Sequence, residues 1–269
     1  MQISEAVAPF PVRAESGIRR LDLSLLAGIA VALCAAVAGI CWAKLDLSYF
    51  LHPTGAAIVL GGTLGVTLVT TPGAALVNSA RRICGLLSAT SIDRESLIEE
   101  IVRYARLTRR EGLPALERAA TENPNAFLRN ALLLAADVTN RDELKNSLEL
   151  ELRLRERHGN ADAKALEVAG GFAPTLGIIG TVIGLIEVMK EFSNLQAVGY
   201  GIGTAFVSTI YGLALANLFL LPLAHRIRAR VAEAFETQEL IMEGVLHIAD
   251  RVHPSLVRIR LRSFLREAR

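Results

Sequence analysis

The stretch APTLGIIGTVIGL (residues 173–185) lies inside an apolar segment that is long enough to cross a membrane. It holds three glycines, two threonines and one proline, and it carries no charge. A helix surrounded only by lipid has no need to give up side-chain bulk, whereas small residues let two helix backbones approach closely. The stretch therefore predicts a membrane helix in close contact with another helix.

Four segments of the 269-residue chain have the composition of membrane-spanning helices, which need about 20 mostly apolar residues. Hydrophobic residues make up 52% of the chain, and almost all charged residues lie outside these segments. The sequence therefore predicts an all-α, polytopic membrane protein with four transmembrane helices and a helical cytoplasmic domain. The segments run from about 23 to 43, from about 54 to 77, from about 168 to 187, and within 192–224.

Orientation follows from basic residues next to the segment ends, because these favour the cytoplasmic side. Arginines precede the first segment and follow the second and the fourth. Both termini and the long middle region are therefore predicted to be cytoplasmic. The predicted parts are an N-terminal extension (1–21), transmembrane helices 1 and 2 (22–79), a cytoplasmic helical domain (80–165), transmembrane helices 3 and 4 (166–225), and a C-terminal cytoplasmic helix with a basic tail (226–269).

The middle region has the pattern of soluble helices. Ser91 and Asp93 are suited to cap a helix whose apolar residues recur at helical spacing, and Gly112 is suited to end it. A short helix with Pro114 in its first turn should follow. We expect two further helices, the second of which continues into the third membrane segment.

Asp, Glu, Lys and Arg are absent from the middle of all four segments. Pumps and proton relays place such a group there, so a partner would have to supply it. The sequence has no metal-ligand spacing, nucleophile elbow or phosphate loop. We therefore expect no enzyme activity and no metal, and the lack of a basic aromatic surface excludes nucleic acid. Cys34, Cys41 and Cys84 have no CxxC spacing, which predicts inert buried thiols.

Small residues and hydroxyl groups recur on the third and fourth segments. Glycines spaced four apart predict close helix packing. The hydroxyl groups either bond to the carbonyl four residues earlier in their own helix or line a path for a small cation, and the spacing leaves both interpretations open. Gly180 and Gly184 are four residues apart, and Gly177 lies seven residues before Gly184 on nearly the same face; the hydroxyl-bearing residues are Thr181, Ser208 and Thr209.

Pro174 and Pro222 form a second pair. The third and fourth segments run in opposite directions, so both prolines should lie at the cytoplasmic ends and at one depth. Each proline removes a helical hydrogen bond and kinks its helix. With Gly170 and Gly171 beside them, they predict a hinge.

Several motifs resemble the MotA/PomA family of flagellar motor stators. APTLGIIGTVIGLIEVM and GIGTAFVSTIYGLALANLFLLPLAHRI resemble its third and fourth membrane helices, IVLGGTLGVTLVTTP its second, and ARLTRREGLPALERAATENPNAFLRNAL its cytoplasmic region. The likeness covers roughly residues 22–250. It implies a multi-pass protein of the bacterial inner membrane that conducts H⁺ or Na⁺ down its gradient and converts ion flow into torque on the rotor.

The resemblance also implies partners. The family forms a pentamer around two copies of a MotB/PomB-type partner, whose single membrane helix brings the ion-binding aspartate. That aspartate would be the carboxylate that the four segments lack. The cytoplasmic domain would push on a rotor switch protein of the FliG type, membrane lipid would surround the helices, and H⁺ or Na⁺ would be transported without any cofactor.

The resemblance assigns rotor contacts to residues of the motif RREGLPALE. The family's rotor-contacting arginine and glutamate fall on Arg109 and Glu117, and the neighbouring Arg110 is able to share the role. Without the resemblance, a solvated charged face would be the preferred explanation of these residues.

The family's functional prolines fall on Pro174 and Pro222, and its ion-path hydroxyls on Thr181, Ser208 and Thr209. Many proton-driven members carry alanine where Thr181 stands, which favours sodium. Sodium-driven members often carry a threonine where Ser208 stands, so the coupling ion stays open.

Other protein classes fit parts of the sequence. The broader superfamily includes ExbB and TolQ, ion-driven energisers of outer-membrane transport that share the last helix pair but typically have three spans. Four spans and the spacing of Arg109 and Glu117 disfavour that alternative. A membrane enzyme lacks supporting motifs, and a partner-dependent ion leak would exclude a purely structural scaffold.

Overall fold

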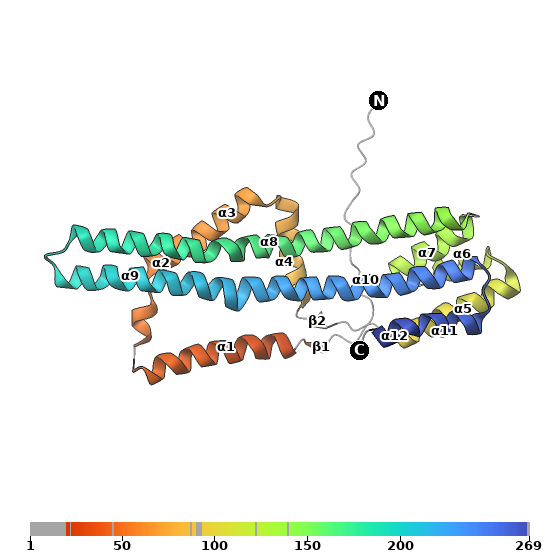
Figure 1. The fold of residues 1–269 in the computed structure, drawn as a ribbon, viewed down its shortest axis with the longest axis horizontal. Coiled ribbons are helices and arrows are strands. Elements are labelled where there is room, and N and C mark those ends of the chain that lie inside the picture. Colours follow the sequence, from red (N-terminus) through yellow and green to blue (C-terminus); the bar gives the residue numbers. More distant parts are fainter. Residues whose placement is uncertain are drawn as a thin grey trace, which may run out of the picture. The chain divides into compact units, whose positions relative to one another are not determined.

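The computed structural model describes residues 20–21, 23–44, 46–86, 88–89, 93–121, 123–138 and 140–267. The predicted N-terminal extension therefore lies outside the described residues, except for its last two. The described chain is almost entirely helical (Figure 1), which confirms the predicted all-α fold class. The helices are α1 (Leu23–Trp42), α2 (Pro53–Ala56), α3 (Gly62–Thr70), α4 (Gly73–Leu86), α5 (Arg94–Glu111), α6 (Ala115–Thr121), α7 (Ala126–Asp137), α8 (Arg141–Lys190), α9 (Leu195–Ala214), α10 (Leu221–Ala249), α11 (Pro254–Leu261) and α12 (Ser263–Glu267).

Short irregular elements join some of these helices. The 3₁₀-helix η1 (Leu47–Phe50) precedes α2, and the π-helical stretches η2 (Ala57–Gly61) and η3 (Leu215–Leu220) connect α2 to α3 and α9 to α10 without a break. Two strands of two residues each, β1 (Arg20–Leu21) and β2 (Ser88–Ala89), pair with one another.

Residue contacts divide the chain into two compact units. Unit 1 comprises residues 1–20, 89–150 and 237–269, and unit 2 comprises residues 21–88 and 151–236. The C-terminal residues from 237 onward therefore belong with the middle region, whereas the sequence boundaries set them apart as a separate tail. The physical reason is burial: apolar side chains of α10 and α11, such as Leu246 and Val257, complete the hydrophobic core around α5.

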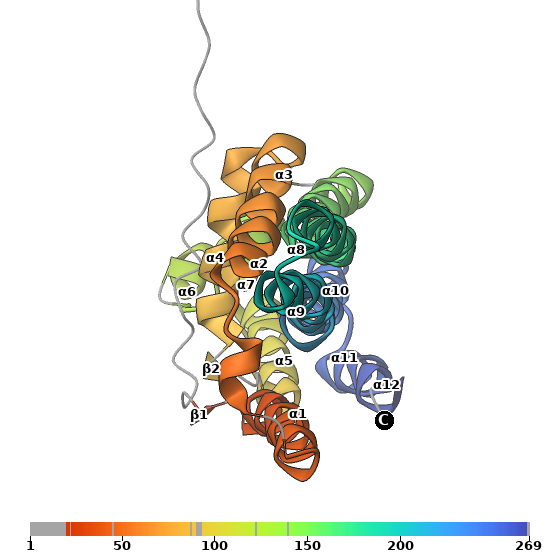
Figure 2. The same cartoon turned by 90° about the vertical axis from the view of Figure 1, so that its left-hand side faces the viewer.

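Unit 2 contains the membrane helices. Part of α8 lies side by side and antiparallel with the continuous helix formed by α9, η3 and α10 (Figure 1). At the turn between them, the Asn194 side chain accepts hydrogen bonds from the backbone N–H groups of Gln196 and Ala197, which caps α9. Seen end-on, α2 lies against α9 (Figure 2), and η2 also contacts α9.

Among the described residues, three helices are long and apolar enough to span a membrane, and they coincide with the second, third and fourth predicted segments: Pro53–Thr70, Arg141–Lys190 and Leu195–Ala249. In α1, Ala27–Trp42 forms a shorter apolar helix. The second segment ends earlier than the predicted Val77, because Pro72 disfavours a helical backbone at the preceding residue. Thr71 is extended, with φ −123° and ψ 130°, and α4 begins at Gly73 as a separate helix.

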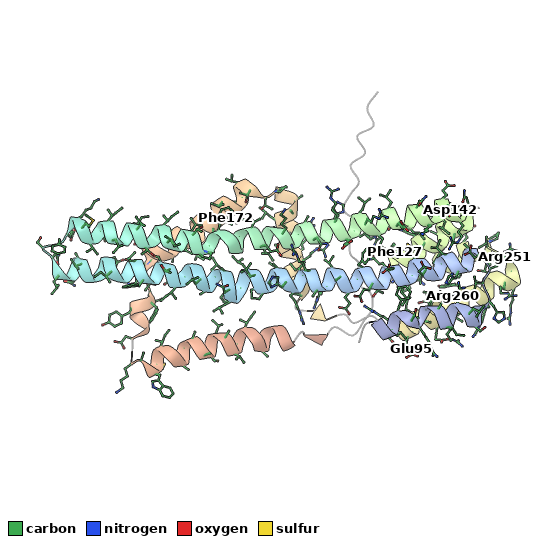
Figure 3. All side chains as sticks on the ribbon, viewed as in Figure 1. Glu95, Phe127, Asp142, Phe172, Arg251 and Arg260 are labelled. Carbon is green, nitrogen blue, oxygen red and sulfur yellow. The ribbon has the colours of Figure 1, made fainter. Side chains whose placement is uncertain are left out.

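Unit 1 is a helical domain with one hydrophobic core. Phe127 lies fully within this core (Figure 3). The carboxylate of Asp93 accepts a hydrogen bond from the Glu95 backbone N–H and caps α5, as predicted. Gly112 ends α5 with φ +86°, a backbone conformation that a side chain would resist, which confirms its role as a stop.

The prediction of buried thiols is wrong. Cys34, Cys41 and Cys84 are free and exposed. The outer surface of a membrane helix faces lipid, so an apolar side chain on α1 needs no protein interior to cover it.

Candidate functional site

Two threonine hydroxyl groups join α8 to α9. Thr181 Oγ1 lies 2.6 Å from Thr209 Oγ1. Thr181 Oγ1 is also 3.1 Å from the carbonyl oxygens of both Gly177 and Ala205, and Thr209 Oγ1 is 3.5 Å from that of Ala205. The two hydroxyl groups therefore bond along their own helices and across the helix pair. The result is a compact group of hydroxyl and carbonyl oxygens, which is the ligand chemistry that a hard cation prefers.

This threonine pair borders an exposed apolar flank. Thr181 and Thr209 are both half-buried. Residues three before and four after each of them lie on the same side of their helices, and all four are exposed hydrophobic side chains. They are Ile178 and Leu185 on α8, and Phe206 and Leu213 on α9. We call this surface, together with the threonine pair, the apolar flank.

The three predicted packing glycines lie at the contact between α8 and α9. A Cβ atom added at Gly184 would lie 2.6 Å from the carbonyl oxygen of Gly201, and one added at Gly177 would lie 3.0 Å from that of Ser208. A Cβ atom added at Gly180 would lie 2.5 Å from the Ser208 Cβ atom. The two backbones are therefore so close that side chains at these positions would force them apart.

Ser208 lies away from the threonine pair. It is fully buried, and its hydroxyl group donates to the Thr204 carbonyl oxygen at 2.6 Å. A Cβ atom added at Gly55 of α2 would lie 2.5 Å from Ser208 Oγ. Consecutive helical residues point about 100° apart, so Thr209 reaches the flank while Ser208 packs between α2 and α8.

The two prolines lie at different levels of the helix pair. Pro174 is inside α8 and faces Gly212 of α9, where an added Cβ atom would lie 3.2 Å from the Pro174 Cα atom. Gly170, one turn before Pro174, instead faces Leu221, the neighbour of Pro222. Pro174 is level with Gly212 of α9, whereas the neighbour of Pro222 is level with Gly170, one turn earlier in α8. The two prolines therefore lie at least one turn apart along the helix pair, and the prediction of one depth is wrong. Pro222 follows directly after the π-helical stretch η3.

A basic cavity in unit 1 contains two of the predicted rotor-contacting residues. Arg109 and Arg110 line a cavity of about 320 Å³ together with residues of α5, of α11 and of the turn before α11. Among the described residues, neither arginine forms an ion pair. The other lining residues are Arg106, His253, Pro254, Ser255 and Arg258. We call this the basic cavity.

Glu117 is exposed on α6 and does not line the basic cavity. Its neighbour Arg118 lies 3.8 Å from Glu111, and both of these side chains are largely exposed. The structure thus brings Arg109 and Arg110 together and leaves Glu117 as a separate charge on the surface of the same unit.

The sequence reasoning missed part of this cavity. Arg106 lies one turn before Arg109 and Arg110, so helical spacing was a sufficient signal for it. Arg258 is far away in the sequence and carried no signal. Its guanidinium lies 2.5 Å from the Glu99 carboxylate, and its Nε atom is buried and has no hydrogen-bond partner in the part of the chain that the structure describes.

A second missed cluster surrounds His52 at the start of α2. The backbone N–H of His52 donates to the Tyr211 hydroxyl at 3.4 Å, and its Nδ1 atom lies 3.3 Å from the Thr204 hydroxyl. Its ring centroid is 5.0 Å from that of Tyr200. The Tyr211 hydroxyl in turn donates to the Phe50 carbonyl oxygen. These contacts fasten the start of α2 to α9.

Comparisons with known proteins show which proteins this chain is similar to. Residues 119–239 match the model of the MotA/TolQ/ExbB proton channel family. Motility protein A of Bacillus subtilis (strain 168) is 28% identical over 250 residues, covering 91% of each chain. Chemotaxis protein PomA of Vibrio alginolyticus is 29% identical over 249 residues, covering 92% of this chain and 95% of its own. The chain is therefore similar to MotA and PomA proteins over about nine-tenths of its length.

Solved structures of MotA/PomA family complexes have the same fold. The structure of C. jejuni MotAB matches with a TM-score of 0.85 and 26% identity, covering 91% of this chain and 96% of that chain. The flagellar MotAB stator complex from Bacillus subtilis matches with a TM-score of 0.80 and 28% identity, covering 87% and 92%. The likeness in fold to these stator structures therefore extends over both units.

Proposed function

We propose that this chain is a flagellar motor stator subunit that conducts H⁺ or Na⁺ with a MotB/PomB-type partner and converts ion flow into torque for motility. The observation that carries the proposal is the apolar flank, which has the Thr181–Thr209 pair at its edge and no carboxylate along α9. Hydroxyl groups can pass a cation along but cannot release or bind a proton near neutral pH. The flank therefore fits a partner helix that brings an acid.

Similarity to MotAB complexes supports this choice of partner. The full proposal is a pentamer around two partner copies in the bacterial inner membrane, with both termini in the cytoplasm. The uncharged segments and the arginines that follow them support this orientation. The subunit would need no cofactor and would catalyse no reaction; H⁺ or Na⁺ would be transported.

The basic cavity supports a rotor contact. Arginines that lack an acidic partner attract carboxylates from another protein, so Arg109 and Arg110 would meet acidic residues of a FliG-type switch protein. Glu117, exposed on the same unit, would meet a basic residue of that protein.

The first test is swimming in a strain that lacks this gene. The strain should keep its flagella but be paralysed, and the wild-type chain should restore swimming. Recovery only in sodium-rich medium would identify Na⁺ as the coupling ion, and recovery in sodium-free potassium medium would identify H⁺. Thr181→Val and Thr209→Val should each lower swimming speed strongly, because valine keeps the shape of threonine but removes the hydroxyl group.

Thr175→Val is the matched control. The Thr175 hydroxyl donates only to the Phe172 carbonyl oxygen of its own helix, at 2.7 Å, so its loss should leave swimming unchanged. Equal swimming of all three variants would contradict the ion-path role of the threonine pair. A deletion strain that swims normally but fails in nutrient uptake across the outer membrane would instead support the ExbB/TolQ alternative.

Charge reversal tests the rotor contact. Arg109→Glu should lower torque, and reversal of an acidic residue on the switch protein should restore it. Arg103→Gln on the same helix is the control, because Arg103 lies outside the cavity and its exposed side chain contacts Glu100 and the Tyr104 ring. Normal torque in Arg109→Glu would remove the basic cavity from the proposed mechanism.

A further inference from the structure

A groove of about 430 Å³ lies in unit 2 between α1 and the junction of η3 with α10. Gly28, Ile29 and Ala32 line it on the α1 side. Leu218 and Pro222 are among the residues on the other side, so the groove runs beside the proline that follows the π-helical stretch. Its volume is within the usual range for a ligand site, about 300–1,000 Å³.

Gly28 differs from the glycines between α8 and α9. A Cβ atom added at Gly184 would clash with backbone atoms of α9, so that glycine serves helix packing. At Gly28, no described atom lies within 4 Å of such a Cβ atom. The small residues of α1 therefore leave space that no described part of the chain fills.

The groove has an apolar wall and a polar end. Ile29, Ala32, Leu218 and Pro222 form hydrocarbon surface, whereas Asn217, His225 and Arg226 add polar groups. The uncharged run 192–224 ends immediately before His225. The imidazole and the guanidinium therefore lie where the membrane interior gives way to the headgroup region, at the depth of lipid phosphates.

We propose that this groove binds one anionic phospholipid, with an acyl chain along Ile29, Leu218 and Pro222 and the phosphate beside Arg226 and His225. An acyl chain matches the apolar wall, since water gains no partners there. A guanidinium pairs with phosphate through charge-assisted hydrogen bonds. A zwitterionic lipid would supply the same chain with less attraction to this basic end.

Bound lipid would also support the helix at its weakest point. Pro222 has no backbone N–H to donate, and the preceding π-helical turn departs from regular helix geometry. An acyl chain packed against Leu218 and Pro222 would add dispersion contacts on the side where α1 leaves a gap. The inference requires only that these helices span a bilayer, so it does not depend on the proposed stator function.

Native mass spectrometry of the full chain, purified from the membrane in mild detergent, tests the proposal. Phosphatidylglycerol or phosphatidylcholine is added, and the lipid retained per subunit is counted. Wild type should retain phosphatidylglycerol preferentially. Arg226→Gln should weaken that retention about fivefold, which corresponds to the roughly 1 kcal/mol that one basic residue contributes near an anionic surface.

Gly28→Leu should abolish retention without any change of charge, because the leucine side chain would occupy the groove. Gly39→Leu is its control: it lies on the same helix and also has no described atom within 4 Å of an added Cβ, but it does not line the groove. Arg81→Gln, an exposed arginine that does not line the groove, controls for Arg226→Gln.

Equal retention of the two lipids by wild type would overturn the proposal, as would unchanged retention in Gly28→Leu. Loss of subunit assembly in Gly28→Leu, with no lipid bound to wild type, would mean that a neighbouring subunit fills the groove and would equally overturn it. Swimming is measured separately. Lipid retention in a protein that fails to restore swimming would leave this inference standing and count against the stator function alone.

Discussion

His247 on α10 links the stability of unit 1 to pH at the scale of one residue. It is buried, its Nε2 atom accepts a hydrogen bond from Arg260 at 3.4 Å, and its Nδ1 atom has no partner among the described residues. Burial, followed by the positive charge of Arg260, lowers the pKa of His247 below 6.5, against opposing effects of Glu243 and Asp250. The unfolded chain therefore binds more protons than the folded chain just below about pH 6.5.

The free energy of unfolding should consequently fall as the pH drops below about 6.5. His247→Leu removes this titrating group and should flatten the decline. The decline is measured as the change in the thermal unfolding midpoint of the purified protein between about pH 7.5 and 5.5. His158→Leu, at an exposed position on α8, should keep the wild-type decline. Parallel pH curves for wild type and His247→Leu would refute the link.

Other residues show what the sequence could reveal at this scale. The resemblance named Thr181, Ser208 and Thr209 together, but spacing could not say which hydroxyl group reaches the apolar flank. That distinction depends on how far α9 is rotated against α2 and α8, and the packing of Gly55 and Gly180 against Ser208 shows this rotation.

At the scale of elements, the contact between α8 and α9 depends on backbone proximity. An added Cβ at Gly184 would lie 2.6 Å from the Gly201 carbonyl oxygen, and backbone cannot move aside as a flexible side chain can. Gly184→Ala should therefore destabilise the folded protein by about 1–3 kcal/mol, the usual cost of overpacking. Thermal unfolding in detergent measures the change.

Gly171→Ala is the control on the same helix. No described atom lies within 4 Å of its added Cβ atom, and alanine favours helix over glycine by up to about 1 kcal/mol. This variant should be neutral or more stable. If the two substitutions had the same effect, close approach of the backbones would not be what holds these helices.

Element boundaries were harder to predict than element types. Asp93 and Gly112 marked the ends of α5 because capping and positive φ are local properties. The break at Thr71 also has a local cause in Pro72, yet the hydropathy of the segment runs on to Val77 and concealed it. The π-helical stretches η2 and η3 had no sequence signal, since both lie in almost uniformly apolar segments that have no periodic pattern to shift.

At the scale of the whole molecule, each unit is assembled from segments far apart in the sequence. The basic tail looked like a separate appendage because its charges dominate its composition. Yet Val257 and Leu261 are fully buried in the core of unit 1. Spacing within the tail could show an amphipathic helix, but not that its apolar side covers α5, because that pairing joins residues about 150 positions apart.

Removal of residues 251–269 should therefore unfold unit 1. Val257 and Leu261 each contribute about 1.5–3 kcal/mol through burial, and the deletion also removes the ion pair between Arg258 and Glu99. Their sum is a large part of the roughly 5–15 kcal/mol that stabilises a typical domain. Limited proteolysis should cut unit 1 of the truncated protein rapidly. A strain that lacks the gene should stay paralysed when it expresses this truncated protein. Removal of residues 266–269 alone spares both buried side chains and should leave protease resistance and swimming intact. Normal swimming of cells whose protein lacks residues 251–269 would show that the core of unit 1 does not need the tail.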